Sequence, residues 1–185
     1  MDARKIAPGL MLAMPQLEDP NFTRSVILMI EHNEEGSFGL IVNRPSDLLV
    51  ADVLSSLGIE WTSDPEELVW SGGPVMPRTG WVLHEPVDIP DEEGKVDVTP
   101  EIVLSTSPDR LRAIAQAPPP RVRFVLGFSG WGPAQLESEL AAGAWITAEV
   151  TPELIFNTPA EEMWETVLRS LGIDPASLVP AAGVH

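Results

Sequence analysis

The sequence predicts a single-domain α+β fold, and three observations support that prediction. Short apolar runs rich in β-branched residues are separated by turn residues, as in strands. Other segments repeat apolar residues at helical spacing behind recognisable start signals. Finally, 185 residues with 44% hydrophobic residues are enough for one substantial core and are far from the composition of disordered chains.

The strands are predicted from their apolar runs. The first two runs flank EHNEEG (31–36), which indicates a hairpin with a long polar loop. The segment 85–101 is acidic and shows no apolar periodicity, so we expect a solvated loop there. The predicted strands cover residues 24–30, 37–43, 67–71, 80–84, 101–105, 122–128 and 144–150.

The helices are predicted from their ends. Thr158-Pro159-Ala160-Glu161 has the pattern of a capping box, in which the Thr158 hydroxyl accepts from the Glu161 backbone N–H. One apolar stripe follows before Gly172, formed by Met163, Trp164, Val167, Leu168 and Leu171. The same signals predict helices over 47–57 and 133–142. They also predict a short helix that starts at Ser107 and turns Leu111, Ile114 and Ala115 inward. The expected organisation is a domain of residues 1–172 followed by a poorly ordered tail, 173–185.

Charge and composition exclude several classes of protein. With 11 Lys and Arg against 28 Asp and Glu, the net charge is −17, and no basic cluster offsets it. Such a surface repels phosphate backbones and anionic lipid, so neither nucleic acid nor a membrane is an expected partner. The absence of Cys removes disulfides, Cys-ligated metals and thiol nucleophiles. The N-terminal segment MDARKIAPGLMLAMPQ is too short and too interrupted by proline for a membrane span, and a cytoplasmic protein is expected.

No catalytic template fits the sequence. GFSGW (127–131) is close to a nucleophile elbow, but Trp131 stands where that motif needs glycine, so Ser129 is not favoured as a nucleophile. A zinc site would need His32 and His84 to meet a carboxylate from a separate segment, and nothing in their spacing requires it. We therefore predict no catalytic residue, no metal site and no cofactor.

Two glycine-rich segments remain as candidate binding elements. In WSGGPV (70–75), Gly72 and Gly73 follow a strand and can form either an anion-binding nest or simply a tight turn. In GFSGWGPAQLESEL, Trp131 precedes a helix whose first turn carries Gln135 and whose backbone N–H groups are unpaired. Trp131 alternatively fills a gap in the core.

Several segments resemble, in order, the AlgH/YqgE family of bacterial proteins. They are PGLMLAMPQLEDPNFTRSVILMIEHNEEGSFGLIVNRP, WSGGPV, WVLH and LGFSGWGPAQLESEL with AW following, and they cover about Pro8 to Gly172. The resemblance implies an α+β fold of coiled, partly bifurcated mixed β-sheets with surrounding helices. Members are often described as transcriptional regulators, although no helix-turn-helix belongs to the pattern and no catalytic residue is defined. Ala134 departs from the family, because relatives usually have glycine there.

The resemblance also places His32, Asn33, Asn43 and Arg44 among the motif residues. Asn43 can close a strand end, with Pro45 entering the next helix. Six of the candidate residues lie at strand ends, turns and helix starts, and we expect them to meet in one cleft: His32, Arg44, Gly72, Gly73, Trp131 and Gln135. The candidate binding residues are His32, Asn33, Asn43, Arg44, Gly72, Gly73, His84, Ser129, Trp131 and Gln135.

The leading functional hypothesis is a non-enzymatic regulatory or interaction protein that binds a small ligand or a protein partner at this cleft. The alternative is a hydrolase or transferase that uses the same cleft. A regulator that binds DNA directly comes third, because the acidic balance disfavours it.

Overall fold

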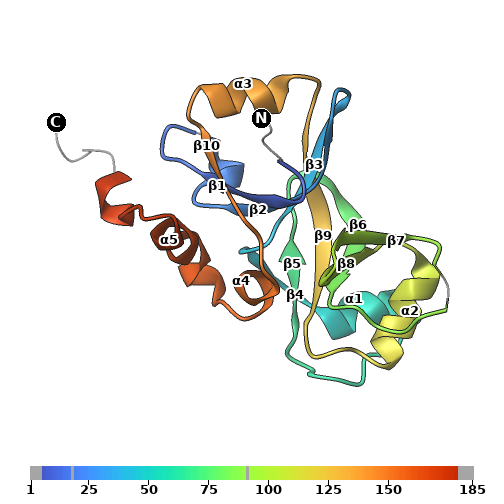
Figure 1. Ribbon diagram of the computed structural model, residues 1–185. Helices are drawn as coiled ribbons and strands as arrows, with labels where there is room; N and C mark the ends of the chain where they lie inside the picture. The colour runs from blue at the N-terminus through green and yellow to red at the C-terminus, as the bar shows by residue number, and fades with distance from the viewer. Residues whose placement is uncertain (1–5, 18, 91, 179–185) are drawn as a thin grey trace.

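A curled and branched β-sheet with helices packed around it forms the protein, which confirms the α+β prediction (Figure 1). The computed structural model describes residues 6–17, 19–90 and 92–178. The strands are β1 Gly9–Ala13, β2 Val26–Asn33, β3 Gly36–Ile41, β4 Pro45–Leu49, β5 Leu68–Ser71, β6 Val75–His84, β7 Lys95–Thr99, β8 Ile102–Ser105, β9 Val122–Trp131 and β10 Trp145–Ala148. The helices are α1 Val50–Ser56, α2 Pro108–Gln116, α3 Gln135–Ala141, α4 Pro152–Phe156 and α5 Ala160–Ser170, with 3-10 turns η1 Pro20–Phe22 and η2 Pro175–Leu178.

The sheet divides at β9, the long strand through the middle of Figure 1. The strand order is β10-β1-β2-β3-β9-β6-β8-β7, and β4 and β5 lie off this path. Val125 and Leu126 of β9 pair with β6 on one edge and, in parallel, with β5 on the other. Further along β9, residues 129–131 pair with β3 instead. The resulting branched, mixed sheet agrees with the fold that the resemblance implies.

Strand β1 and the first four residues of β2 are buried on both faces. Successive side chains of a strand point to opposite sides, so they join different core clusters. Leu10 and Leu12 join the core cluster that α5 covers, while Met11 and Ala13 join the cluster that α3 covers. A third cluster packs α1 and α2 against β5, β6 and β9, with Val50, Leu54, Val69, Ile114 and Phe124 in it. In Figure 1, α1 and α2 accordingly lie beside β6 and β8, on the far side of β9 from α4 and α5. No helix within the described ranges is long and apolar enough to cross a membrane.

The predicted long hairpin loop is wrong. β2 continues to Asn33 and β3 begins at Gly36, and these two residues are paired, which leaves Glu34 and Glu35 as the turn. Asn33 Oδ1 accepts from the Glu35 backbone N–H at 2.8 Å and shapes that turn. Gly36 has φ 138°, and a Cβ there would overlap the Trp131 carbonyl oxygen, so only glycine fits.

Some predicted element ends are also corrected. Pro45 opens β4 instead of a helix, and α1 begins only at Val50. The segment 85–101 contains strand β7.

The predicted capping box at α5 does not form. Pro159 is the N-cap residue, and its side chain has no acceptor for a capping bond. The Thr158 hydroxyl instead donates to the Glu153 carbonyl of α4 at 3.2 Å. The apolar stripe of α5 is buried as predicted at Met163, Trp164, Val167 and Leu168, but Leu171 is 40% exposed.

Residues 173–178 of the expected tail continue the fold. Ile173 and Leu178 pack against the cluster that α5 covers, and Pro175 is buried in η2. Residues 179–185 lie outside the described residues.

Candidate functional site

His32 and Asn33 lie at the tip of the β2–β3 hairpin, beside α3. The His32 ring bonds with Ser37 Oγ through Nδ1 at 2.6 Å, and its Nε2 lies 3.2 Å from Glu137 Oε2. These contacts attach the hairpin tip to the first turn of α3. The His32 side chain is only 19% exposed, so its two ring nitrogens are largely occupied within the protein.

Trp131 and Gln135 share the carboxylate of Glu139, a residue that the sequence did not single out. Glu139 Oε1 accepts from the indole N–H of Trp131 at 3.0 Å and of Trp145 at 2.8 Å, while its Oε2 accepts from Gln135 Nε2 at 3.1 Å. Gln135 Oε1 also accepts from the Gly132 backbone N–H at 2.9 Å. Trp131 is buried and packs edge-on against Trp145, so its role as a core residue is what the geometry favours.

Asn43 and Arg44 hold the segment before β2 in place. Asn43 Oδ1 accepts from the Val26 backbone N–H at 3.0 Å, and its Nδ2 donates to the Arg24 carbonyl at 3.1 Å. The Arg44 guanidinium donates to the carbonyls of Asn21 and Thr23, the latter at 3.0 Å. Burial lowers the pKa of Arg44 from its ordinary value. Both side chains thus form hydrogen bonds with backbone groups that no neighbouring strand pairs.

Gly72, Gly73 and Ser129 lie where the chain that leaves β5 passes close to the backbone of β9. A Cβ at Gly72 would lie 2.5 Å from the Gly127 carbonyl oxygen, and one at Gly73, where φ is 149°, would overlap the Phe128 carbonyl. The Ser129 hydroxyl is fully buried and donates to the Gly72 carbonyl at 3.1 Å. Close backbone approach therefore explains both glycines.

His84 belongs to a buried polar network with Ser105 and Arg110. Its Nδ1 lies 2.6 Å from the Glu85 carbonyl and must carry the proton, because a carbonyl only accepts. Its Nε2 then accepts from the Ser105 hydroxyl at 2.8 Å, and Ser105 Oγ accepts from Arg110 Nε at 2.8 Å. Burial lowers the pKa of His84, and the nearby Arg110 charge adds to that effect, so the ring is neutral near pH 7.

The ten predicted residues thus fall into four local groups. They are the hairpin tip with α3 (His32, Asn33, Trp131, Gln135), the contacts to the segment before β2 (Asn43, Arg44), the close approach of the chain after β5 to β9 (Gly72, Gly73, Ser129), and the buried network of His84. None of them lines the cavity described next. A single cleft that unites them stays a prediction.

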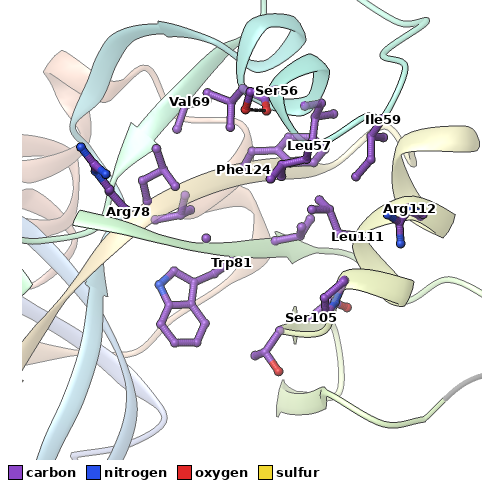
Figure 2. Close-up of a pocket in the computed structure, with 18 of the residues that line it drawn as sticks. Ser56, Leu57, Ile59, Val69, Arg78, Trp81, Ser105, Leu111, Arg112 and Phe124 are labelled. Carbon is purple, nitrogen blue, oxygen red and sulfur yellow. Dashed lines mark hydrogen bonds between the residues drawn. The ribbon is translucent and has the colours of Figure 1, made fainter. Parts of the chain in front are cut away.

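The cavity lies between α1, α2 and the strands β5, β6 and β9, and Figure 2 shows its lining. Its volume is about 590 Å³, within the range of about 300–1,000 Å³ typical of small-molecule sites. The apolar wall is formed by Leu48, Val53, Leu54, Leu57, Ile59, Val69, Pro77, Trp81, Val82, Leu111, Phe124, Val125 and Leu126. Leu54, Val69 and Phe124 are buried in the third core cluster, so this wall is continuous with the hydrophobic core.

Two arginines are the charged residues among the described residues that line this cavity. Arg78 comes from β6 and Arg112 from α2, and both are exposed. Figure 2 shows them at opposite ends of the lining, with Val69, Leu57, Phe124 and Leu111 between them. No motif points to either residue, because the lining is contributed by segments from Leu48 to Leu126 that meet only in the folded chain.

Within the described part of the chain, no cluster of three or more His, Asp or Glu side chains is arranged to hold a metal ion. The arrangement around the cavity instead offers apolar contact along its length and a cation at each end.

The branched sheet, the strand order and the flanking helices define an AlgH-like protein. A model of the AlgH-like family matches residues 10–176, and the chain belongs to this family. A UPF0301 protein of Myxococcus xanthus is 46% identical over 184 residues, which covers 98% of this chain and 99% of the relative. A UPF0301 protein of Vibrio cholerae is 42% identical over 180 residues, covering 94% and 95%.

Two solved structures share the fold. The solution structure of the AlgH protein from Pseudomonas aeruginosa superposes with a TM-score of 0.78 at 34% identity, over 96% of this chain and 95% of that one. A crystal structure from Corynebacterium diphtheriae has a TM-score of 0.70 at 26% identity, over 92% and 90%. These similarities establish the family and the fold.

Proposed function

We propose that this protein is a non-enzymatic regulatory or interaction protein that acts by binding a small, largely apolar ligand in the cavity between α1 and α2. The observation that supports the proposal is the cavity itself, because its volume and apolar wall match those of small-molecule sites.

Exposed leucines at the cavity add to this argument. Leu48 is 47% and Leu57 53% exposed, although both belong to the lining. Covering apolar surface contributes about 25 cal/mol per Å² removed from water. A ligand that covered these exposed side chains would therefore gain binding free energy from them in addition to its contacts with the buried wall.

A blocked cavity tests the proposal. Gly80 lies in the lining, and a Cβ there would come no closer than 3.6 Å to Leu126 and 3.9 Å to the Val125 carbonyl, so Gly80→Leu is compatible with the fold. Gly130→Leu is the matched control, because it adds the same bulk at another strand glycine outside the cavity, where a Cβ would have 3.4 Å to Phe128.

The probe is decanediol, a neutral molecule with an apolar chain, and binding is measured by calorimetry. We expect it to bind the wild type and Gly130→Leu with similar affinity and Gly80→Leu at least about tenfold more weakly, since the added side chain takes up part of the volume. Equal affinity for all three proteins, or none for the wild type, would contradict the proposal.

A hydrolase or transferase is the second candidate, favoured by the Ser105–His84 hydrogen bond at the cavity wall. A neutral histidine that accepts from a serine hydroxyl is the minimal arrangement for nucleophilic catalysis. It ranks second because Ser105 is only 2% exposed and its oxygen already accepts from Arg110. Labelling of the wild type by a fluorophosphonate, absent in Ser105→Ala, would move this candidate to first place.

Direct DNA binding is the third candidate and remains disfavoured by the net charge of −17. In anisotropy titrations at moderate salt, we expect affinity no tighter than nonspecific binding.

A further inference from the structure

The cations of the described chain divide into those with partners and two without. Most are engaged: Arg24 and Arg169 with Glu165, Arg44 with backbone carbonyls, Lys95 with Glu92 and Asp97, Arg110 with Ser105, Arg121 with Glu153, and Arg123 with the Val122 and Phe156 carbonyls. Among the described residues, only Arg78 and Arg112 make no hydrogen bond, ion pair or ring contact, and both line the same cavity.

Their lack of partners is notable in so acidic a chain, where 28 carboxylates compete for 11 cations. Asp109 precedes Arg112 by three residues on α2, a spacing at which helical side chains commonly pair. These two described residues nevertheless form no ion pair. The guanidinium of Arg112 is therefore available to another anion.

The hydroxyl groups of the cavity, in contrast to the two arginines, already take part in hydrogen bonds. Ser56 donates to the Val53 carbonyl at 2.7 Å, Thr106 to the Gly94 carbonyl at 3.2 Å, and Ser107 caps α2 by accepting from the Arg110 backbone N–H. Ser105 is held in the His84 network. The arginines are thus the polar side chains of the described lining that form no hydrogen bond or ion pair, and they are its charged groups.

We propose that the ligand is an elongated dicarboxylate, with an apolar chain along the cavity and one carboxylate at each end, bound by Arg78 and Arg112. The inference rests on the proposed function, since it names the ligand class of the same cavity. The placement of the two arginines at opposite ends of the lining carries it (Figure 2). A guanidinium suits a carboxylate because two of its N–H groups can donate in parallel to the two oxygens.

One acid group is not enough to satisfy this arrangement. A monocarboxylate would leave one arginine unpaired, and it could bind in either direction. An extended polyanion is excluded for a different reason, because the net charge of −17 repels it beyond the two local cations. A small dianion meets only the positive ends of the cavity.

The test compares three ten-carbon probes, decanedioate, decanoate and decanediol, by calorimetry on the wild type, Arg78→Gln, Arg112→Gln and the double variant. Arg169→Gln is the matched control, because that arginine is exposed and lies outside this cavity, paired with Glu165. Circular dichroism checks that each variant is folded.

We expect decanedioate to bind the wild type and Arg169→Gln about tenfold more tightly than decanediol, and each single cavity variant to lose about five- to tenfold of that affinity, as expected for charge-assisted hydrogen bonds that water partly screens. For decanoate, each single variant should lose no more than about twofold, because the chain can reverse, and only the double variant should lose the full effect.

Decanediol binding as tightly as decanedioate, or decanedioate affinity that is the same in Arg78→Gln and Arg112→Gln as in the wild type, would overturn the dicarboxylate assignment and leave the cavity as an apolar site. Failure of all three probes to bind the wild type would overturn the assignment together with the proposed function.

Discussion

Truncation of Trp164 is the sharpest test of how α5 is attached to the sheet. The indole is 6% exposed in the main core cluster, and its Nε1 donates to the Ala13 carbonyl at 2.9 Å, across 151 residues of sequence. The Arg24 guanidinium lies over the ring, 4.5 Å from its centroid. Trp164→Ala removes all three interactions at once.

The cost can be estimated from these contacts. Truncating a buried tryptophan to alanine costs about 3–5 kcal/mol of unfolding free energy in transfer and cavity terms. The carbonyl of Ala13 also loses its donor, but Ala13 and Trp164 border a second cavity, so water can restore part of that bond. We therefore expect a loss of about 4–5 kcal/mol. At about 2–4 °C per kcal/mol for a chain of this size, the melting temperature should fall by about 8–20 °C.

Urea unfolding followed by far-ultraviolet circular dichroism measures this loss. Trp164→Phe keeps most of the apolar ring but removes the donor, and should cost about 1–2 kcal/mol. Leu171→Ala is the control at the C-cap of the same helix, where 40% exposure limits the expected cost to less than about 1 kcal/mol. If Trp164→Ala cost no more than Leu171→Ala, the packing of α5 against β1 would be wrong.

Three further predictions concern backbone geometry and pH. Ala134 has φ 64° at the start of α3, so Ala134→Gly should raise the unfolding free energy by up to about 1 kcal/mol in the same urea assay, and a loss would contradict the strain argument. Gly73→Ala should cost more than about 3 kcal/mol because its Cβ overlaps the Phe128 carbonyl, whereas Gly58→Ala, also at positive φ but with open space around it, should cost only about 1 kcal/mol. Burial lowers the pKa of folded His84, so the unfolded state takes up its proton first as pH falls below about 6.5, and stability should fall there by up to about 1.4 kcal/mol per pH unit more steeply than in His84→Asn. Equal slopes for the two proteins would mean that His84 titrates alike in both states.

The parts of the fold that the sequence predicts are those with strong local signals. The apolar runs of β2 and β9 mark those strands although both extend beyond their predicted ends. Ser107 caps α2 as expected, accepting from the Arg110 N–H at 3.2 Å. β7 was missed although Val96 and Val98 alternate with polar residues, because the surrounding acidic residues outweighed that short pattern. The capping box at Thr158 was wrong because α5 begins at Ala160, with Pro159 as its N-cap residue. The Thr158 hydroxyl instead donates to α4, a five-residue helix that the sequence pattern did not indicate.

The cavity could not have been predicted in the same way. Its wall belongs to strands and helices whose apolar residues are indistinguishable in sequence from ordinary core residues, such as Leu54 and Phe124. Arg78 and Arg112 carry no motif, and what distinguishes them is that neither has a partner among the residues that the structure describes. That property depends on where every other charge lies, so it becomes visible only with the side chains in place.

Arg44, one of the candidate binding residues, could bind a ligand only by giving up hydrogen bonds within the protein. Its guanidinium already donates to the Asn21 and Thr23 carbonyls, and those groups would be left unpaired if it turned toward a ligand. Arg44→Ala should therefore cost about 1–3 kcal/mol of unfolding free energy and increase amide hydrogen exchange in residues 20–26, next to the bonds it removes. Decanediol affinity should stay unchanged, because Arg44 does not line the cavity. A stable Arg44→Ala protein with unaltered exchange would instead mean that the guanidinium is free to bind a ligand, and the single-cleft prediction would regain its strongest candidate.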